Sequence, residues 1–264
     1  MNKDFLTKII ADKKEEVAAA RRSLPESLLR DKAAVPQKRR MFFKKLEQPG
    51  PSGINIIAEI KRASPSKGEI RRDINPAIYA SEYERGGAAA LSVLTDRTYF
   101  KGSIKDFKTA RQAVTIPVLR KDFLISAYQI YESAVIGADA VLLIARILSQ
   151  NQLKDYLNLC NELNMDALVE INTKEDFELA TNAGARLIGI NNRDLSTFKT
   201  DINTTINMAS LLKPDQVAVA ASGIRTREDI EKIQKAGIWN FLIGESLMRA
   251  LNPRDFLMSL MGKR

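Results

Sequence analysis

Charged side chains lie near the ends of several short apolar segments of this sequence. Glu59 and Lys61 close the segment INIIAEIK, two residues apart, and Glu170 lies within DALVEIN. Lys121 lies near the end of PVLRKDF. An ammonium and a carboxylate that share one pocket can act as general acid and general base when their pKa values are shifted. For any single one of these residues, an exposed strand end or a structural ion pair is the simpler interpretation.

The chain contains no histidine and one cysteine, which narrows the available chemistry. Without histidine, the commonest general base and the commonest metal ligand are both absent, so proton transfer falls to lysine, glutamate or aspartate. We expect neither a metal nor another cofactor. Cys160 cannot form an internal disulfide, and its helical context, DYLNLCNELN, predicts a small buried apolar residue. This cysteine usage fits a reducing cytoplasm, where we expect the protein to work.

The formal net charge of +9 raises the question of an anionic partner. The densest basic clusters, QKRR and FFKK within residues 37–45, lie in a short connection. No zinc-finger spacing, RNA-binding aromatic signature or helix-turn-helix pattern accompanies them, so a small anionic substrate is favoured over nucleic acid. The first residues, MNKDFLTKIIADKKEE, mix charged with apolar residues, unlike a signal peptide. No apolar run reaches the length of about 20 residues that a membrane helix needs.

Short β-branched segments alternate with longer helical patterns from residue 54 onward. Eight such segments are predicted to be strands: 54–61, 90–96, 117–123, 140–146, 166–172, 186–192, 217–223 and 240–246. Their spacing of roughly 20 to 35 residues is that of a strand followed by a crossover helix. Eight units predict a (β/α)₈ TIM barrel. A doubly wound open sheet is the alternative, but its glycine-rich first turn is absent from ASPSKGEI.

Local signals mark where the intervening helices begin and end. Pro76 suits a first helical turn, and Thr226 followed by Asp229 has the spacing of a capping pair. Glycines before several strands predict helix C-termini. The segment DFLTKIIADKKEEVAAARR has the apolar spacing of an added helix. We therefore predict one domain over 1–264, with an N-terminal helical extension (1–53) packed on the barrel (54–264).

The strand ends of such a barrel meet at one rim, where (β/α)₈ enzymes hold their active sites. Glu59 and Lys61 share a face because side chains alternate along a strand, and Asn191 and Arg193 share one at the sixth strand. Together with Lys121, these residues predict a pocket at that rim. Glycines after the last two strands suit either tight turns or close approach of the backbone to a phosphate.

The sequence resembles the indole-3-glycerol phosphate synthases along nearly its whole length. The segments that carry the resemblance, in order, are AEIKRASPSKG, GGAAALSVLTD, YFKGS, VLRKDF, LVEINT, IGINNRDL, ASGI and FLIGESLMR. Within them, Glu-x-Lys-x-x-Ser-Pro-Ser is a specific element. The resemblance implies a (β/α)₈ barrel with an N-terminal helical extension. It also implies conversion of 1-(2-carboxyphenylamino)-1-deoxyribulose 5-phosphate to indole-3-glycerol phosphate, with release of carbon dioxide and water, in tryptophan biosynthesis.

The resemblance also implies roles for individual residues. By resemblance Lys121 is the general acid at the ribulose carbonyl and Glu170 the general base, with Glu59 and Lys61 assisting. Lys61 also resembles the residue that holds the anthranilate carboxylate. The remaining matches are the expected pocket residues Asn191 and Arg193, the expected apolar wall Phe100, Phe123, Leu142 and Ile243, and the expected phosphate-site residues Ser64, Ser222, Gly223, Gly244 and Glu245. We expect Arg193 to pair with a pocket carboxylate and Glu245 to contribute only its backbone N–H.

One position departs from the family pattern. Where the family usually reads Glu-Ser-Gly-Ile, this chain has Ala221 before Ser222 and Gly223. A pocket carboxylate is therefore missing, and a working but weakened enzyme is expected. We expect a monomer with a small anionic substrate. The alternatives are a Schiff-base aldolase that uses Lys121 or Lys61 as nucleophile, a non-catalytic anion-binding or nucleic-acid-binding barrel, and the neighbouring pathway isomerase.

Overall fold

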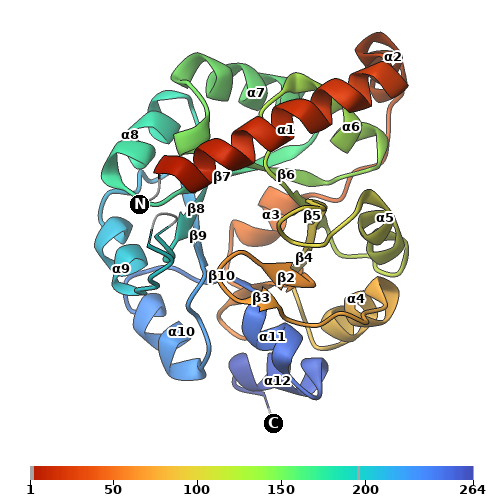
Figure 1. Cartoon of the computed structure of the whole chain (residues 1–264). Coiled ribbons are helices and arrows are strands. Elements are labelled where there is room, and N and C mark those ends of the chain that lie inside the picture. The colour runs from red at the N-terminus through yellow and green to blue at the C-terminus, as the bar shows by residue number, and fades with distance from the viewer. Residues whose placement is uncertain (1–2, 195–196, 264) are drawn as a thin grey trace.

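Eight parallel strands close into a barrel in the order β1-β10-β9-β8-β7-β6-β5-β4 (Figure 1). The computed structural model describes residues 3–194 and 197–263. The predicted (β/α)₈ barrel is confirmed. Its strands are β1 (Asn55–Ile60), β4 (Ala90–Leu94), β5 (Val118–Lys121), β6 (Ala140–Ile144), β7 (Asp166–Ile171), β8 (Leu187–Asn191), β9 (Val217–Ala221) and β10 (Asn240–Ile243).

Helices alternate with the strands and surround the barrel (Figure 1). Those that follow strands are α4 (Pro76–Arg85), α5 (Ile104–Gln112), α6 (Ala127–Val135), the short 3₁₀ helix η1 (Ala145–Ile147), α7 (Gln150–Glu162), α8 (Lys174–Asn182), α9 (Asn203–Ala209), α10 (Arg227–Gln234), α11 (Glu245–Arg249) and α12 (Pro253–Leu260). Among the described residues, no helix is both long and apolar enough to cross a membrane.

The predicted strands begin within one residue of the observed ones but run one to three residues too far. The segment predicted over 240–246, for example, ends as β10 at Ile243, and the segment over 117–123 ends as β5 at Lys121. The predicted catalytic residues lie at these strand ends: Glu59 and Glu170 are the last residues but one of β1 and β7, Lys121 ends β5, and Lys61 directly follows β1.

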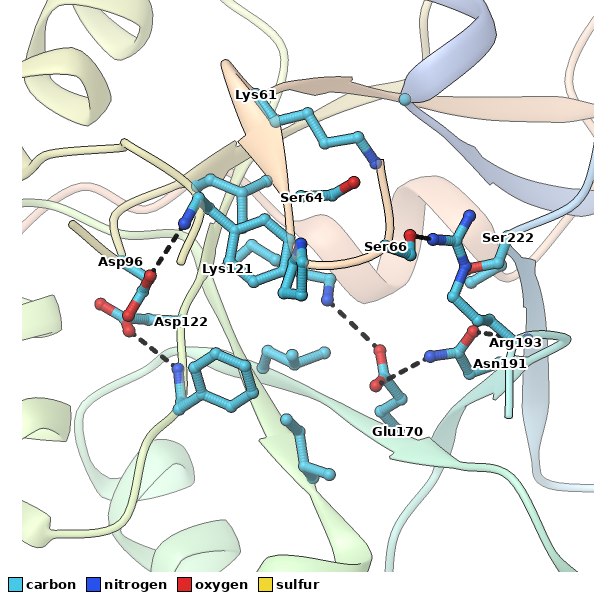
Figure 2. A pocket seen from close by; sticks show the side chains of 18 of the residues that line it. Lys61, Ser64, Ser66, Asp96, Lys121, Asp122, Glu170, Asn191, Arg193 and Ser222 are labelled. Atoms are coloured by element: carbon cyan, nitrogen blue, oxygen red, sulfur yellow. Dashed lines mark hydrogen bonds and ion pairs between the residues drawn. The ribbon is translucent and has the colours of Figure 1, made fainter. Parts of the chain in front are cut away.

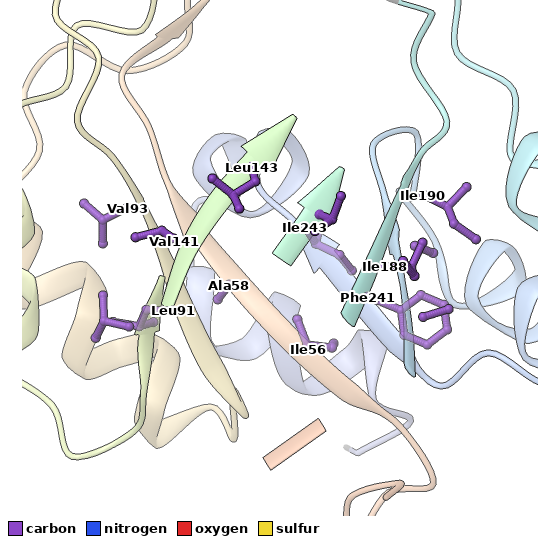
Figure 3. Close-up of a cluster of buried hydrophobic side chains, with 14 of the residues drawn as sticks. Ile56, Ala58, Leu91, Val93, Val141, Leu143, Ile188, Ile190, Phe241 and Ile243 are labelled. Atoms are coloured by element: carbon purple, nitrogen blue, oxygen red, sulfur yellow. The ribbon is translucent and has the colours of Figure 1, made fainter. Parts of the chain in front are cut away.

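Both faces of the strands are buried, and they pack against different partners. Ile56 and Ala58 of β1 point outward into the layer between strands and helices, which Figure 3 shows with labelled residues from β4, β6, β8 and β10. Ile57, one residue away, points into the barrel, where it joins Leu119 and Leu168. This two-residue period is that of a strand. Since Glu59 follows Ile57 on the same face, its carboxylate lies inside the barrel.

The local signals at helix ends are confirmed. Pro76 is the first residue of α4, and Thr226 and Asp229 form a reciprocal capping box at the start of α10. Gly137, Gly184 and Gly237, each shortly before a strand, have φ values of 85°, 91° and 86°. Glycine adopts this left-handed conformation without the steric cost that a Cβ atom imposes, which is why it ends these helices.

The N-terminal extension consists of three helices, where the sequence predicted one. They are α1 (Lys3–Ser23), α2 (Glu26–Ala34) and α3 (Phe42–Leu46). Side chains from α1 reach the cavity at the C-terminal ends of the strands. Helix α3 lies at the opposite end, where Phe42 and Leu46 are fully buried against the inner residues of the barrel. The extension thus reaches both ends of the barrel.

The Ser-Pro-Ser-Lys-Gly loop after β1 has regular structure of its own. It folds into a two-stranded antiparallel ribbon of β2 (Ala63–Ser64) and β3 (Gly68–Glu69). Gly68, with φ of 62°, follows the turn as the first residue of β3 and pairs with Ser64. This ribbon projects over the rim and carries Ser64 and Ser66 to the cavity.

Candidate active site

A cavity with about 1020 Å³ of empty space, part of it open to solvent, lies at the C-terminal ends of the strands (Figure 2). All four predicted catalytic residues line it: Glu59, Lys61, Lys121 and Glu170. They come from β1, the residue after β1, β5 and β7. The closure of the barrel therefore gathers charges that are more than 100 residues apart in the chain.

The four charges form two ion pairs. Lys61 Nζ lies 2.7 Å from Glu59 Oε1, and Lys121 Nζ lies 3.3 Å from Glu170 Oε2. Asn191 donates its side-chain N–H to Glu170 Oε1 at 3.2 Å, so both oxygens of this carboxylate have a partner (Figure 2). The hydroxyl of Ser92 lies 3.4 Å from Glu59 Oε2. Each pair places an ammonium donor beside a carboxylate acceptor.

The pairing outweighs burial in setting two of the pKa values. Burial lowers the pKa of Lys121, but the charges of Glu170 and Glu59 outweigh it and raise the pKa above its ordinary value. Burial likewise raises the pKa of Glu59, but the ammonium groups of Lys61 and Lys121 outweigh it and lower the pKa below the usual range. Near neutral pH, Lys121 is therefore a charged proton donor and Glu59 a charged acceptor.

One side of the cavity is apolar. Of the four residues predicted to form this wall, Phe100, Phe123 and Leu142 line the cavity, and the rings of Phe100 and Phe123 lie 6.1 Å apart. Ile243 does not line it. Its side chain points outward into the layer between strands and helices, and the neighbouring Leu242 lines the cavity instead. The prediction for Ile243 was wrong by one residue. Adjacent side chains of a strand point to opposite faces, so that of Ile243 points away from the cavity.

Residues of α1 complete this wall, and the sequence analysis missed them. Phe5, Leu6 and Ile9 line the cavity, which lies beneath the N-terminal half of the helix. The ring of Phe5 lies 5.5 Å from that of Tyr99 and 5.6 Å from that of Phe198, in loops after β4 and β8. The other residues that line the cavity and were not predicted are Pro65, Ser66, Leu94, Asp96, Asp122, Ile144, Phe198 and Leu242.

The opposite side of the cavity is polar and cationic. It includes Ser64, Ser66, Arg193, Ser222 and Gly244. Arg193 donates from Nη1 to Ser66 Oγ and so links the end of β8 to the ribbon after β1 (Figure 2). Within the part of the chain that the structure describes, Ser64 Oγ and Arg193 Nε are buried without a hydrogen-bond partner. Buried polar atoms are rarely left unpaired, so this side has donors to offer a ligand.

Two predicted phosphate-site residues do not line the cavity. Glu245 pairs with Arg249 at 3.2 Å and lies 3.5 Å from Arg193. Arg193 thus has a carboxylate partner, as expected. That partner is Glu245, which does not line the cavity. Burial raises the pKa of Glu245, and Arg249 outweighs burial and lowers it, so Arg249 is the cation chiefly responsible. Gly223 lies behind the cavity, where an added Cβ atom would come within 2.3 Å of Thr200 Cγ2.

Gly244 is required by its neighbours in the cavity. A Cβ atom at this position would lie 2.4 Å from Glu59 Oε1 and 3.0 Å from Lys61 Nζ. Any larger residue would therefore displace one of the two ion pairs. Ser222, with φ of 67°, precedes Gly223, with φ of 78°, so two successive residues after β9 have the left-handed conformation. This turn brings Ser222 to the cavity wall.

No metal site accompanies these groups in the described ranges, since no three or more Asp, Glu or Cys side chains gather there in a suitable arrangement. For proton transfer and hydrogen bonding the cavity offers lysine, glutamate and asparagine side chains. An apolar wall faces a cationic side across the two acid–base pairs. Such a cavity suits a ligand with an aromatic part and an anionic part.

The fold and the cavity define a (β/α)₈-barrel protein with an acid–base site at the carboxyl ends of its strands. Its residues 6–260 match the model of the indole-3-glycerol phosphate synthase family. The chain belongs to this family. Relatives named indole-3-glycerol phosphate synthase from Desulfosudis oleivorans and Syntrophobacter fumaroxidans are 57% and 52% identical to it, over 98% of this chain and of each relative.

A solved structure with much lower sequence identity has a similar fold. Thiamine phosphate pyrophosphorylase from Pyrococcus furiosus superimposes with a TM-score of 0.60 over 79% of this chain and 94% of that chain. Only 15% of the residues are identical, so this likeness concerns the barrel alone.

Proposed function

We propose that this protein is an indole-3-glycerol phosphate synthase, a carboxy-lyase of tryptophan biosynthesis. The substrate is 1-(2-carboxyphenylamino)-1-deoxyribulose 5-phosphate. Its aromatic ring closes onto the ribulose carbonyl carbon, and carbon dioxide and water leave to give indole-3-glycerol phosphate. Membership of the family supports the reaction. The observation that carries the assignment is the pair of ammonium–carboxylate contacts in one cavity, between an apolar wall and a cationic side.

Lys121 is the general acid of the ring closure. Attack by the aromatic carbon places negative charge on the ribulose carbonyl oxygen, and an ammonium stabilises that charge and then donates a proton. Burial lowers the pKa of Lys121, but the charge of Glu170 outweighs burial and raises it. The amine therefore stays protonated. Loss of carbon dioxide then restores two electrons to the ring system.

Glu170 is the general base of the dehydration. Its carboxylate takes a proton from the cyclised intermediate, while an ammonium protonates the departing hydroxyl to give water. The bond from Asn191 to Glu170 Oε1 orients the carboxylate and leaves Oε2 toward Lys121. Glu59 and Lys61, joined at 2.7 Å, assist as a second pair.

The two ends of the cavity orient the substrate. The anthranilate ring packs against Phe100, Phe123 and Leu142, and Lys61 holds the ring's carboxylate. The phosphate lies at the polar side, where Ser64 Oγ and Arg193 Nε lack partners among the described residues. Ser222 and Gly244, in the turns after β9 and β10, also line this side. This placement aligns the aromatic carbon with the ribulose carbonyl.

An assay of product formation tests this function. Indole fluorescence is followed after addition of the carboxyphenylamino sugar phosphate to the purified protein. We expect it to rise with turnover, and a flat signal with intact substrate would contradict the assignment. Borohydride added during turnover should trap no covalent adduct. A trapped amine on Lys121 or Lys61 would instead support the Schiff-base aldolase.

The protein works in the cytoplasm and as a monomer. The buried thiol of Cys160 suits a reducing compartment. Light scattering at micromolar concentration should give the mass of one chain, 29.5 kDa. A mass twice as large would overturn the monomer.

A further inference from the structure

A lysine of the N-terminal extension is buried among carboxylates next to the cavity. The side chain of Lys13, in the middle of α1, is only 1% exposed. Its Nζ lies 2.9 Å from Asp96 Oδ2, 2.8 Å from Asp122 Oδ1 and 2.9 Å from Glu16 Oε2. Lysine is rarely buried so completely, and burial of an ammonium is costly unless it is well paired.

The two aspartates that Lys13 contacts are part of the cavity wall. Asp96 and Asp122 both line the cavity, and their side chains are 0% and 1% exposed. Asp96 Oδ1 accepts hydrogen bonds from the backbone N–H groups of Tyr99 and Phe100, at 2.6 and 3.0 Å, and so fixes the turn that carries the Phe100 ring. Asp122 follows Lys121 directly in the chain and precedes Phe123.

Lys13 is the main counter-charge for these aspartates. Arg120 also approaches Asp122, at 3.4 Å, but its closer partner is Glu132 at 2.7 Å. Burial alone would lower the pKa of Lys13, but the charges of Asp122 and Asp96 outweigh it and raise the pKa. The ammonium is therefore charged at any physiological pH. Without it, two buried carboxylates would face a substrate that itself carries a carboxylate and a phosphate.

The same ammonium fixes the position of α1. Phe5, Ile9 and Lys13 are four residues apart and so lie along one stripe of the helix. Phe5 and Ile9 line the cavity from above, while Lys13 reaches the loops after β4 and β5. The stripe thus combines an apolar contact for the ligand with one buried ion-pair contact to the barrel. Asp12, the residue before Lys13, adds a hydrogen bond that it accepts from the Tyr99 hydroxyl.

We propose that Lys13 is a positioning residue for substrate binding: it anchors α1 over the cavity and neutralises Asp96 and Asp122, so that an anionic substrate can bind. This inference depends on the function proposed above. It assigns to the extension an electrostatic role in addition to its apolar contacts. Lys13 acts through the two aspartates and does not touch the substrate.

The test compares Lys13→Met with the wild type under steady-state turnover. We expect KM for the carboxyphenylamino sugar phosphate to rise about tenfold or more. The uncompensated aspartate charges would repel the bound anion, and solvent screens buried charges only weakly. We expect kcat to change less than threefold. An unchanged KM would overturn the proposal, and so would a loss confined to kcat. Turnover by the wild type tests the function separately.

Two further variants separate charge from structure. In Lys13→Met/Asp96→Asn the asparagine oxygen still accepts from Tyr99 and Phe100, but one negative charge is gone. We expect this variant to recover most of the lost affinity, and equal KM values for the single and double variants would contradict neutralisation. Arg39→Met, the matched control, removes a cation that also ties the extension to the barrel, far from the cavity, by three bonds to backbone carbonyl oxygens. It should leave KM unchanged.

Folding of Lys13→Met is checked by circular dichroism at the assay temperature. If the single variant does not fold, the comparison moves to the double variant and Asp96→Asn alone. Asp96→Asn should then bind substrate at least as tightly as the wild type, since it removes a negative charge and keeps Lys13. A tenfold weaker affinity of Asp96→Asn would overturn the proposal.

Discussion

The two ends of the barrel both contain buried charges, but those charges are used differently. At the N-terminal end, Asp139 accepts from the backbone N–H groups of Arg40 and Val118, each at 2.9 Å, and Asp166 accepts from that of Phe43 at 2.8 Å. Arg39 donates to three carbonyl oxygens. Helix α3 fills the remaining space with fully buried Phe42 and Leu46.

At the C-terminal end the charges surround empty space. Lys121 has Glu170 as its ion-pair partner, and Lys61 has Glu59, among the described residues. Ser64 Oγ and Arg193 Nε have no hydrogen-bond partner there. A buried charge by itself therefore does not identify a functional site. What distinguishes the catalytic end is a cavity with donors and acceptors that the protein leaves available.

The largest effect is expected from Lys121→Ala at the C-terminal end. Loss of the general acid should lower kcat by about 10²-fold or more, because the ring closure loses both its proton donor and a stabilising charge. Single-turnover fluorescence measures the rate, and circular dichroism checks the fold. A kcat within threefold of the wild type would remove Lys121 from the mechanism.

At the N-terminal end, Asp139→Ala should affect stability and not turnover. The substitution leaves two backbone N–H groups and Arg111, which lies 3.3 Å from Asp139, without their acceptor. Removing one member of such a buried network costs about 3–5 kcal/mol of unfolding free energy. Urea denaturation measures this loss. If kcat of the folded variant also fell tenfold, the two ends would not be separable as we describe.

A pH profile makes the comparison sharper. In the wild type, the charge of Glu170 outweighs the burial of Lys121 and raises its pKa, so the ammonium persists above the ordinary lysine range. In Glu170→Gln that charge is absent and burial lowers the pKa. The alkaline limb of kcat/KM should therefore move to lower pH in the variant, whose rate is also expected to fall by about 10²-fold. An alkaline limb at the same pH in both proteins would show that Lys121 is not the group that titrates there.

The smallest effect is expected from Ala221→Glu. Ala221 is the last residue of β9 and lines the cavity, at the position where the family resemblance of the sequence implies a glutamate. Restoring the carboxylate should raise kcat/KM a few-fold, since it adds a hydrogen-bond acceptor for the substrate. Steady-state fluorescence kinetics measure the gain. An equal or lower kcat/KM would show that the alanine does not weaken this enzyme.

The sequence predicts the barrel and the gathering of charged residues at one rim because both follow from local patterns, whereas the acid and base roles come from the family resemblance. Strand segments and helix signals such as Thr226 and Pro76 set the order of elements, and barrel closure then brings Lys61, Lys121 and Glu170 to one rim. The strand ends are harder to predict. In a strand that is buried on both faces, such as NFLI in β10, both sets of alternate residues are apolar. The sequence therefore does not reveal which set points into the barrel, and this explains the error at Ile243.

The contribution of α1 depends on packing between distant segments. The apolar spacing of Phe5 and Ile9 predicts a helix but not the surface that it covers. A lysine on the same stripe was the available signal, because Lys13 interrupts the apolar series that continues at Val17. Its meaning depends on Asp96 and Asp122, which are 83 and 109 residues away along the chain. No local pattern connects them.

The proposed mechanism requires that one cavity aligns the substrate between Lys121 and Glu170. A crystal structure with a substrate analogue whose ribulose carbonyl is reduced to a hydroxyl tests it most directly. We predict that Lys121 Nζ lies within hydrogen-bonding distance of that hydroxyl, about 2.6–3.2 Å, with the phosphate beside Arg193 and Ser64. An analogue bound away from the rim, or bound there with its hydroxyl out of reach of Lys121, would contradict the account.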